Sequence, residues 1–424
     1  MAKKRDVRVR RTPARSDDTP RTAAGRSESF SISSEVDEAA RAAAEKRRQR
    51  SRKPRLRKRW IVFGVAALLA LIVWLNWDSL NPESVWTWLS VTVTGGETGD
   101  GYPAPIEGSS VVDMAPVGQY LAVLTDNTLD VYNRTAGKVM SWTHNYASPL
   151  LDTAGGRILI AELGGHRLCV KTVDGRTTEI QAAHNIVAAT LAENGSFAVV
   201  TDSDKSHISE VVYYNNRGDE KLHWYSSEAL ILGIALRKDA RQMAAIGLCS
   251  QNGAAQSRLL VFDTNSAQEP VRYSGDDVML CAVEYLSGGQ IAAIGDTAAW
   301  IVRPGREDME IRPYADMRLL GYAVSGHQLS VAVRPYGTTL GGQLLTWDQN
   351  GNPVYQHSFE GMFRDLSAGD RGFLLLTDSA VTALNDRGNP ASIDVPSDGL
   401  MVSRAFGNLT ALLELTTLNA FPVG

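Results

Sequence analysis

The chain has 424 residues, with 37 glycines, 3 cysteines and a formal net charge of −4. This length is too great for one compact core unless the fold is a repeat or a barrel, and three cysteines are too few for a disulfide framework. The small net charge hides two parts of opposite sign, because residues 1–59 hold 20 Lys and Arg against 8 Asp and Glu, whereas the remainder holds 23 against 39. Each part therefore has its own charge character and its own expected environment.

The basic N-terminal part divides into two segments. Residues 1–33 are polar and rich in Arg, Ser and Thr, with no apolar face to bury, so we predict a disordered cytoplasmic arm. Residues 34–59 begin with strong helix formers and predict a basic juxtamembrane helix that Pro54 ends or bends. The arm has too few aromatic side chains for base stacking, so we expect no nucleic-acid partner.

Residues 60–77, WIVFGVAALLALIVWLNW, form an apolar segment with tryptophans at its ends. As a helix this segment would span ~27 Å, close to the ~30 Å thickness of a hydrocarbon core. Indole rings favour the membrane interface, which suits the terminal tryptophans. A buried core helix is the alternative, and the strongly basic flank before Trp60 argues against it. We therefore predict one transmembrane helix over residues 60–77.

The charge on the two sides of this segment predicts its orientation. The basic sequence KRRQRSRKPRLRKR, residues 46–59, precedes the segment, whereas few basic residues follow Asp78. This asymmetry predicts a cytoplasmic N-terminus and an extracytoplasmic remainder, and residues 46–59 are expected to attract anionic lipid head groups. The bulky run Leu75-Asn76-Trp77 offers no cleavage site, so we interpret the segment as an uncleaved signal anchor in the cell membrane. Residues 78–99 would then form a stalk.

Short apolar runs separated by Gly, Asn and Asp fill the chain beyond residue 108, without helical periodicity. This pattern is typical of all-β proteins. One strongly apolar run recurs eight times at a mean spacing of about 41 residues, with starts at residues 120, 157, 197, 243, 291, 329, 373 and 410. A turn ending in glycine recurs every 42 residues or so, at Gly137, Gly175, Gly218, Gly305, Gly351 and Gly388, and the stretch DTNSAQEP fills the remaining slot.

A period of about 40–45 residues with several short strands predicts a β-propeller built of four-stranded blades. Each unit begins with a strand near the axis, and the apolar run is the second strand, buried between neighbouring blades. The last unit ends one strand short, after TLNAFPV at residues 417–423. The segment GYPAPIEG, residues 101–108, would complete that unit as its outer strand and close the ring. We predict eight blades over residues 100–424, with seven as the alternative if one unit is misassigned.

Three units share an Asn- or Asp-containing turn followed by a large aromatic residue. They are Leu129–Trp142, then Tyr214–Gly218 with Trp224, and Trp347–Gly351 with Tyr355 in the place of Trp. These units resemble the repeat of quinoprotein-like (PQQ-like) propellers, in which a strand is followed by Thr-Gly-Lys and by a Trp. The resemblance implies that this aromatic residue packs between blades.

From Lys46 onward the arrangement also resembles a family of single-pass bacterial membrane proteins, mainly from Gram-positive anaerobes, that carry a propeller of unknown function. The resemblance lies in architecture and repeat spacing, and it implies a fold and a location but no catalytic residues. WD40 propellers are the neighbouring alternative. The one GH…WD pair, Gly326-His327 and Trp347-Asp348, does not recur in other units.

The familiar catalytic and metal-binding patterns do not occur in the sequence. Cys169, Cys249 and Cys281 lie apart in apolar runs, unlike the adjacent cysteines of quinoprotein dehydrogenases, and we interpret them as small buried residues, with one disulfide as the alternative. The seven histidines have no short paired spacing, and the stretch Asp202–Ser206 is not followed by the Gly and Glu of a calcium loop. No GxSxG or Walker motif occurs. We therefore expect no enzyme activity, cofactor or metal.

Two insertions offer the best candidates for contact with a partner. The longer one lies between two predicted strands, and long loops on rigid scaffolds often carry binding residues. Its candidate interaction residues are Arg334, Tyr336, Thr338, Thr339 and Gln343. The shorter insertion is SQNGAAQS, residues 250–257.

The leading hypothesis from the sequence is a non-catalytic, membrane-anchored extracytoplasmic propeller that acts as a protein-interaction scaffold or sensor at the cell envelope. Envelope or membrane proteins would be its partners. The hypothesis follows from the anchor, the repeats and the missing catalytic pattern, since a propeller fold by itself does not specify an activity. The alternative is a propeller that binds or hydrolyses envelope glycans, which clustered exposed aromatic residues would favour.

Overall fold

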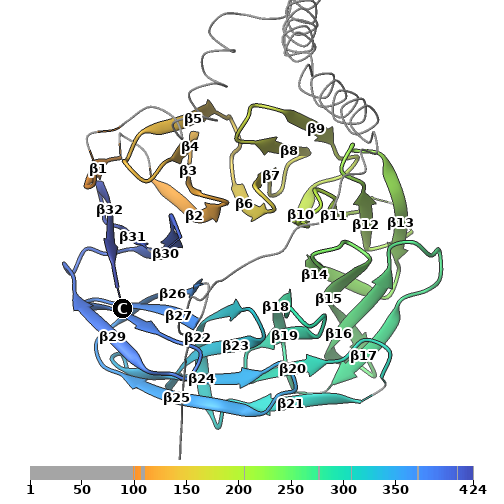
Figure 1. Cartoon of the computed structure of the whole chain (residues 1–424). Helices are drawn as coiled ribbons and strands as arrows, with labels where there is room; N and C mark the ends of the chain where they lie inside the picture. The colour runs from red at the N-terminus through yellow and green to blue at the C-terminus, as the bar shows by residue number, and fades with distance from the viewer. Residues whose placement is uncertain are drawn as a thin grey trace, which may run out of the picture. The chain divides into compact units, whose positions relative to one another are not determined.

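The computed structural model describes residues 99, 101–106, 110–204, 206–275, 277–306, 308–369, 372–407 and 409–423. These residues contain 32 strands and no helix, and the strands form eight four-stranded antiparallel sheets. Figure 1 shows the sheets arranged in a ring, as the blades of a propeller. The predicted all-β, eight-bladed fold is therefore confirmed, and the seven-bladed alternative is wrong.

The blades are numbered 1 to 8 in the order of their first strands, which lie nearest the axis of the ring (Figure 1). The first strands are β2 (Val111–Val117), β6 (Pro149–Ala154), β10 (Ile186–Leu191), β14 (Ala229–Leu236), β18 (Leu280–Tyr285), β22 (Met317–Ser325), β26 (Phe363–Gly369) and β30 (Met401–Ala405). The second strands are β3 (Tyr120–Thr125), β7 (Arg157–Glu162), β11 (Phe197–Asp202), β15 (Gln242–Gln251), β19 (Ile291–Gly295), β23 (Gln328–Pro335), β27 (Gly372–Thr377) and β31 (Leu409–Leu413).

The outer half of each blade consists of a third and a fourth strand. The third strands are β4 (Thr128–Tyr132), β8 (Arg167–Thr172), β12 (Ser209–Tyr214), β16 (Ala254–Asp263), β20 (Ala298–Val302), β24 (Gly342–Asp348), β28 (Ala380–Leu384) and β32 (Thr417–Pro422). The fourth strands are β5 (Lys138–Thr143), β9 (Thr177–Gln181), β13 (Glu220–Ser226), β17 (Val271–Gly275), β21 (Met309–Pro313), β25 (Pro353–Phe359), β29 (Pro390–Asp394) and, in blade 8, β1 (Ala104–Pro105).

The second strands are apolar because neighbouring blades cover both of their faces. Every residue of β19 and β27 is buried. Successive side chains of a strand point to opposite faces of its sheet. In β3, Leu121 and Val123 accordingly pack against blade 8, whereas Ala122 and Leu124 pack against blade 2. This two-sided burial was predicted from the recurring apolar run, and the structure confirms it.

The ring closes where the first described strand joins the last blade. In β1, Ala104 pairs with Leu418 of β32, and Pro105 pairs with Thr417. The Tyr102 hydroxyl donates a hydrogen bond to the carbonyl oxygen of Asn133 in blade 1, at 2.9 Å. The Tyr102 ring lies 5.7 Å from that of Phe406 in blade 8. The predicted closing strand is confirmed, although it contains only two residues.

The recurring polar turns between third and fourth strands have a common hydrogen-bonded geometry. In blade 1 the side-chain oxygen of Asn133 accepts hydrogen bonds from the backbone N–H groups of Thr135 and Gly137, both at 2.9 Å. Such side-chain oxygens mimic a backbone turn, and three other blades repeat the arrangement with Asn215, Asp348 and Asn385. In blade 1 it is Ala136, with φ 63°, that takes the left-handed conformation supplied by glycine in other blades.

The predicted arm (1–33), juxtamembrane helix (34–59) and transmembrane helix (60–77) lie outside the described residues, as does the predicted stalk apart from Gly99. Within the part of the chain that the structure describes, no helix has the length and apolar character needed to cross a membrane.

Ring closure predicts a specific sensitivity to substitution at β32. Leu418 is fully buried beside β1, so Leu418→Ala is expected to lower the free energy of unfolding by about 2–5 kcal/mol, because a cavity replaces its side chain. Leu415, which is 68% exposed three residues earlier, is the matched control, and Leu415→Ala should change stability by less than about 0.5 kcal/mol. Urea unfolding followed by tryptophan fluorescence measures both. Equal effects of the two substitutions would contradict the proposed closure.

Candidate functional site

The two ends of each blade give the ring two distinct faces. One end carries the connections between second and third strands and the connections between successive blades, and we call it the loop face. The other end carries the remaining connections, and we call it the turn face. Contacts between blades agree with this division. On the loop face, the N–H of Gly341 donates to the carbonyl oxygen of Gly361 at 2.6 Å, and on the turn face Arg303 donates to Asn350 at 2.6 Å.

Large exposed apolar side chains in connections occur on the loop face. Among the described residues, the exposed large apolar side chains outside strands all belong to loop-face connections, whereas the turn-face connections have none. We call these seven residues the apolar loop set: Ile208, Met279, Tyr336, Leu340, Met362, Leu400 and Leu415. The most exposed are Leu415 (68%), Tyr336 (64%) and Leu340 (59%). Exposed apolar side chains concentrated on one side of a molecule are typical of an interaction surface.

The five candidate residues of the longer insertion differ in exposure and in position. Tyr336, Thr338 and Thr339 are exposed in the connection between β23 and β24. Arg334 is buried, and its Nε donates to the carbonyl oxygen of Gly341 at 2.7 Å, so its side chain closes the base of the loop. Burial and the nearby Arg318 lower the pKa of Arg334.

Gln343 lies within β24, opposite Val333 of β23, and its side chain accepts a hydrogen bond from Gln356 at 2.5 Å. The apolar tip residue Leu340 is also exposed, although it was not among the predicted residues. The shorter predicted insertion is not an irregular loop. It consists of the ends of β15 and β16, joined by a two-residue turn at Asn252 and Gly253.

Three histidines converge on one buried carboxylate in blade 3. Glu210 of β12 is only 3% exposed. The Nε2 atom of His223, on β13, lies 3.1 Å from one Glu210 carboxylate oxygen. The Nε2 atoms of His207 and His184 lie 3.5 and 3.6 Å from the other oxygen, to which the Ser203 hydroxyl donates at 3.0 Å.

An exposed aromatic ring covers this histidine–glutamate cluster. Tyr225 pairs directly with Glu210 across β12 and β13. Its ring centroid lies 4.4 Å from those of both His207 and His223, and it is stacked on His223. This cluster could not be predicted from the sequence, because its histidines lie far apart along the chain. Only the pairing register of β12 and β13 brings Glu210, Tyr225 and His223 together.

The pKa of Glu210 is set more by hydrogen bonds and nearby charge than by burial. Burial alone would raise its pKa, but hydrogen bonds from His223 and Ser203, together with positive charge on His184 and His223, lower it below the usual range. The Nε2 atoms of the three histidines face the Glu210 carboxylate. In the described part of the chain, no three His, Cys, Asp or Glu residues form a group suited to hold a metal ion.

A second set of carboxyl groups lies on first strands, around the axis. The Asp152 carboxylate accepts a backbone hydrogen bond from Leu191 of the next blade at 2.7 Å, and Asp365 accepts one from Val402 at 2.8 Å. These bonds tie neighbouring first strands together. Burial raises the pKa of Asp152 and Asp365, and burial with the nearby Asp152 charge raises the pKa of Glu284 to about 8.

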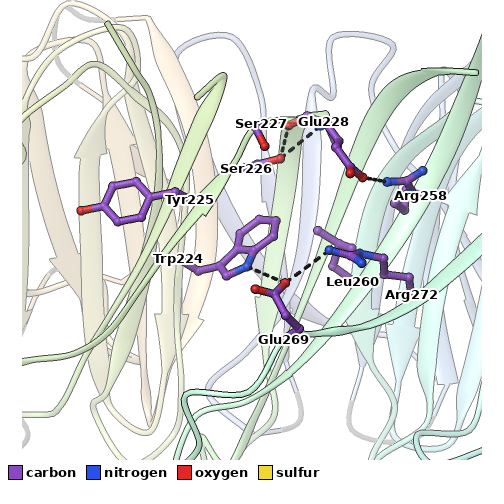
Figure 2. A pocket seen from close by; sticks show the side chains of 10 residues that line it. Trp224, Tyr225, Ser226, Ser227, Glu228, Arg258, Leu260, Glu269 and Arg272 are labelled. Atoms are coloured by element: carbon purple, nitrogen blue, oxygen red, sulfur yellow. Dashed lines mark hydrogen bonds and ion pairs between the residues drawn. The ribbon is translucent and has the colours of Figure 1, made fainter. Parts of the chain in front are cut away.

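A groove lies between the outer strands of blades 3 and 4, and we call it the blade 3–4 groove (Figure 2). It contains a cavity of about 180 Å³ that adjoins another of about 660 Å³, and Trp224 of β13 lines both. The Trp224 ring packs edge-on against Phe262 at 5.2 Å, and its Nε1 donates to Glu269 at 3.3 Å. Figure 2 shows Tyr225 pointing away from this groove, toward the opposite face of β13.

Two arginine–glutamate pairs lie near Trp224 in the groove, and Glu269 of one pair is hydrogen-bonded to the indole (Figure 2). Arg258 pairs with Glu228 at 2.8 Å, and Arg272 pairs with Glu269 at 3.3 Å. The groove therefore presents guanidinium and carboxylate groups beside an indole ring.

The cysteines are all free, so the disulfide alternative is not observed. Cys169 and Cys249 are buried as predicted, and burial raises the pKa of Cys169 to about 11. The prediction was wrong for Cys281, whose side chain is exposed. Cys281 lies on a first strand, β18, where the pairing with β19 shifts register between Leu280 and Ala282. The prediction of the inter-blade aromatic residues is confirmed, because Trp142, Trp224 and Tyr355 each pack into a core between two blades.

A family model described as a family of unknown function, DUF5711, matches residues 103–392. The match covers more than half of the chain. The chain belongs to this family. A search of curated proteins finds no match.

Solved propellers resemble the chain in fold. The C-terminal WD40 domain of Sif2 is 11% identical with a TM-score of 0.56, and the alignment covers 76% of this chain and 99% of that domain. A structure of a eukaryotic initiation factor is 10% identical with a TM-score of 0.50, covering 78% and 89% of the two chains. At these identities the similarity shows the propeller fold alone.

The histidine–glutamate cluster predicts a pH-dependent contribution to stability. Glu210→Gln is expected to lower the free energy of unfolding by about 1–3 kcal/mol at pH 6, because a buried charged hydrogen-bond acceptor is lost. The folded pKa of Glu210 is lowered, so its stabilisation is present above the unfolded value of about 4.3 and is lost as the pH falls through the folded value. The deficit of the variant should therefore shrink at pH 3.5.

Urea unfolding at the two pH values measures this difference. Glu220→Gln is the matched control, because Glu220 also contacts His223 but its side chain is 51% exposed. A deficit that is the same at both pH values, or an equal deficit in the Glu220 variant, would show that the cluster does not stabilise the fold in this way.

Proposed function

We propose that this protein is a membrane-anchored, extracytoplasmic interaction platform that binds an envelope protein through the loop face of its propeller. The observation that carries the proposal is the restriction of the apolar loop set to that face. Burying apolar surface is the main driving force of protein association. A turn face made of polar turns offers no comparable surface, so a partner approaching the ring gains most on the loop side.

The insertion between β23 and β24 is the most prominent part of the proposed surface. Tyr336 and Leu340 are both more than half exposed. The base of the loop is fixed by Arg334, and the Gly341–Gly361 hydrogen bond holds the loop beside the connection that carries Met362. A preorganised loop loses little conformational freedom when it binds, which favours affinity.

The location is proposed from the sequence. Residues 60–77 match the length and the interfacial tryptophans of a membrane helix, and the basic residues 46–59 precede it. This arrangement suits a single-pass protein with a cytoplasmic N-terminus, and the ring would then face envelope or membrane proteins. The basic segment would contact anionic lipid head groups.

The loop-face proposal predicts loss of a partner on charge substitution. The double variant Tyr336→Asp/Leu340→Asp should reduce recovery of the crosslinked partner at least tenfold, because full burial of each side chain contributes ~1.5–3 kcal/mol. The matched control is Gln119→Asp/Asn216→Asp, at exposed positions on the turn face. Crosslinking in cells followed by quantitative mass spectrometry is the measurement. A partner recovered equally with both variants would contradict binding by the loop face.

The location is tested with Cys281, the exposed cysteine of the described residues. A membrane-impermeant maleimide added to intact cells should label Cys281, because Cys281 is exposed while Cys169 and Cys249 are buried. Cys281→Ser should abolish the labelling. Labelling that appears only after the cells are broken would place the propeller in the cytoplasm.

A further inference from the structure

We propose that the blade 3–4 groove binds an acidic saccharide, with its carboxylate on Arg258 and its ring against Trp224. No residue of the apolar loop set lines either cavity of the groove, although Ser227 and Glu228 of the smaller cavity belong to the loop-face connection between blades 3 and 4. The inference rests on the hydrogen bonding of Arg258, on the indole wall and on the placement of the surrounding donors and acceptors.

Arg258 is a largely buried guanidinium that is not fully hydrogen-bonded. Its side chain is only 17% exposed, and its Nη1 donates to Glu228 at 2.8 Å. Its Nε is enclosed by protein and has no hydrogen-bond partner. A guanidinium binds a carboxylate best through two parallel N–H donors. Because Arg258 lines the smaller cavity, its two terminal nitrogens can form such a pair with a ligand carboxylate.

The ion pair with Glu228 does not prevent a ligand carboxylate from binding Arg258. The Glu228 side chain is 68% exposed, and an ion pair with an exposed partner contributes little because water competes for both groups. A ligand carboxylate can therefore replace Glu228 on the same guanidinium, and Glu228 then turns to solvent. The charge balance at Arg258 is unchanged by the replacement.

The remaining walls suit a ring with hydroxyl groups along its edge. Trp224 provides a flat apolar surface whose position is fixed by its contact with Phe262. Its hydrogen bond to Glu269 also holds the ring in place (Figure 2). Glu269 offers acceptor oxygens on one side of the indole, and Arg272 offers donors beside it. Binding sites for small molecules combine an apolar wall with a few fixed polar groups in this way.

The size of the two cavities suits a chain of small units. The cavity beside Arg258 is about 180 Å³, below the ~300–1,000 Å³ of pockets for drug-sized ligands, so it fits one sugar residue. The adjoining cavity of about 660 Å³ continues past Trp224 and is lined by Lys221, Asn265 and Gln268. Neighbouring residues of an oligosaccharide would lie there.

The test is titration of the full-length protein with trigalacturonate, followed by tryptophan fluorescence and calorimetry. Fully methyl-esterified trigalacturonate is the neutral counterpart, and trialanine supplies a carboxylate on a peptide. We expect trigalacturonate to bind at least tenfold more tightly than either. Arg258→Gln should remove this tenfold preference, and Trp224→Leu should weaken the acid and the ester together.

Arg241→Gln is the matched control, because Arg241 is an exposed arginine of the same blade and does not line the groove. Tyr336→Asp/Leu340→Asp should bind trigalacturonate as the wild type does, which separates this inference from the loop-face proposal. Thermal unfolding confirms that each variant is folded, and Arg258→Lys, which keeps the charge but loses the paired donors, replaces Arg258→Gln if that variant unfolds. Equal binding of acid and ester, no binding of trigalacturonate, or tighter binding of trialanine would overturn the inference.

Discussion

Two-sided burial of every blade is the constraint on which the whole ring depends. A second strand such as β27 has apolar side chains on both faces, so each sheet is stable only between two neighbours. The chain must therefore return to its first blade. The two-residue strand β1 is sufficient because Tyr102, Met114 and Phe406 pack blade 8 against blade 1. Closure thus depends more on packing between blades than on the few hydrogen bonds of the last strand.

The two faces of the ring differ in how far their residues are needed to hold the blades together. The turn face is held by side-chain oxygens such as those of Asn133 and Asn385, which cap the backbone of their own turns. Blades also contact each other there through pairs such as Arg303 and Asn350. The loop face has connections of unequal length, and these carry all the large exposed apolar side chains found in the described connections. A rigid scaffold with one adaptable face is the arrangement expected of a binding protein.

The fold was predictable because it follows from local periodicities, whereas the sites depend on register. A repeat of about 41 residues fixes the number of blades without any knowledge of contacts. The convergence of His184 and His223 on Glu210 depends on which residues of adjacent strands are opposite one another, and a shift of one residue would move His223 to the other face. Arg334 shows the same limit, because a charged loop residue is expected to be exposed, yet its side chain closes its own loop.

The overall charge of the outer portion restricts how an acidic ligand can be bound. Residues 60–424 hold 23 basic and 39 acidic residues, so the long-range field of the ring repels anions and slows their approach. Affinity for an acidic saccharide must then come from short-range contacts. Such contacts need a guanidinium that is shielded from solvent and not fully hydrogen-bonded, as Arg258 is. The repulsion elsewhere would also confine anionic ligands to that groove, which makes the site more selective than a basic surface would be.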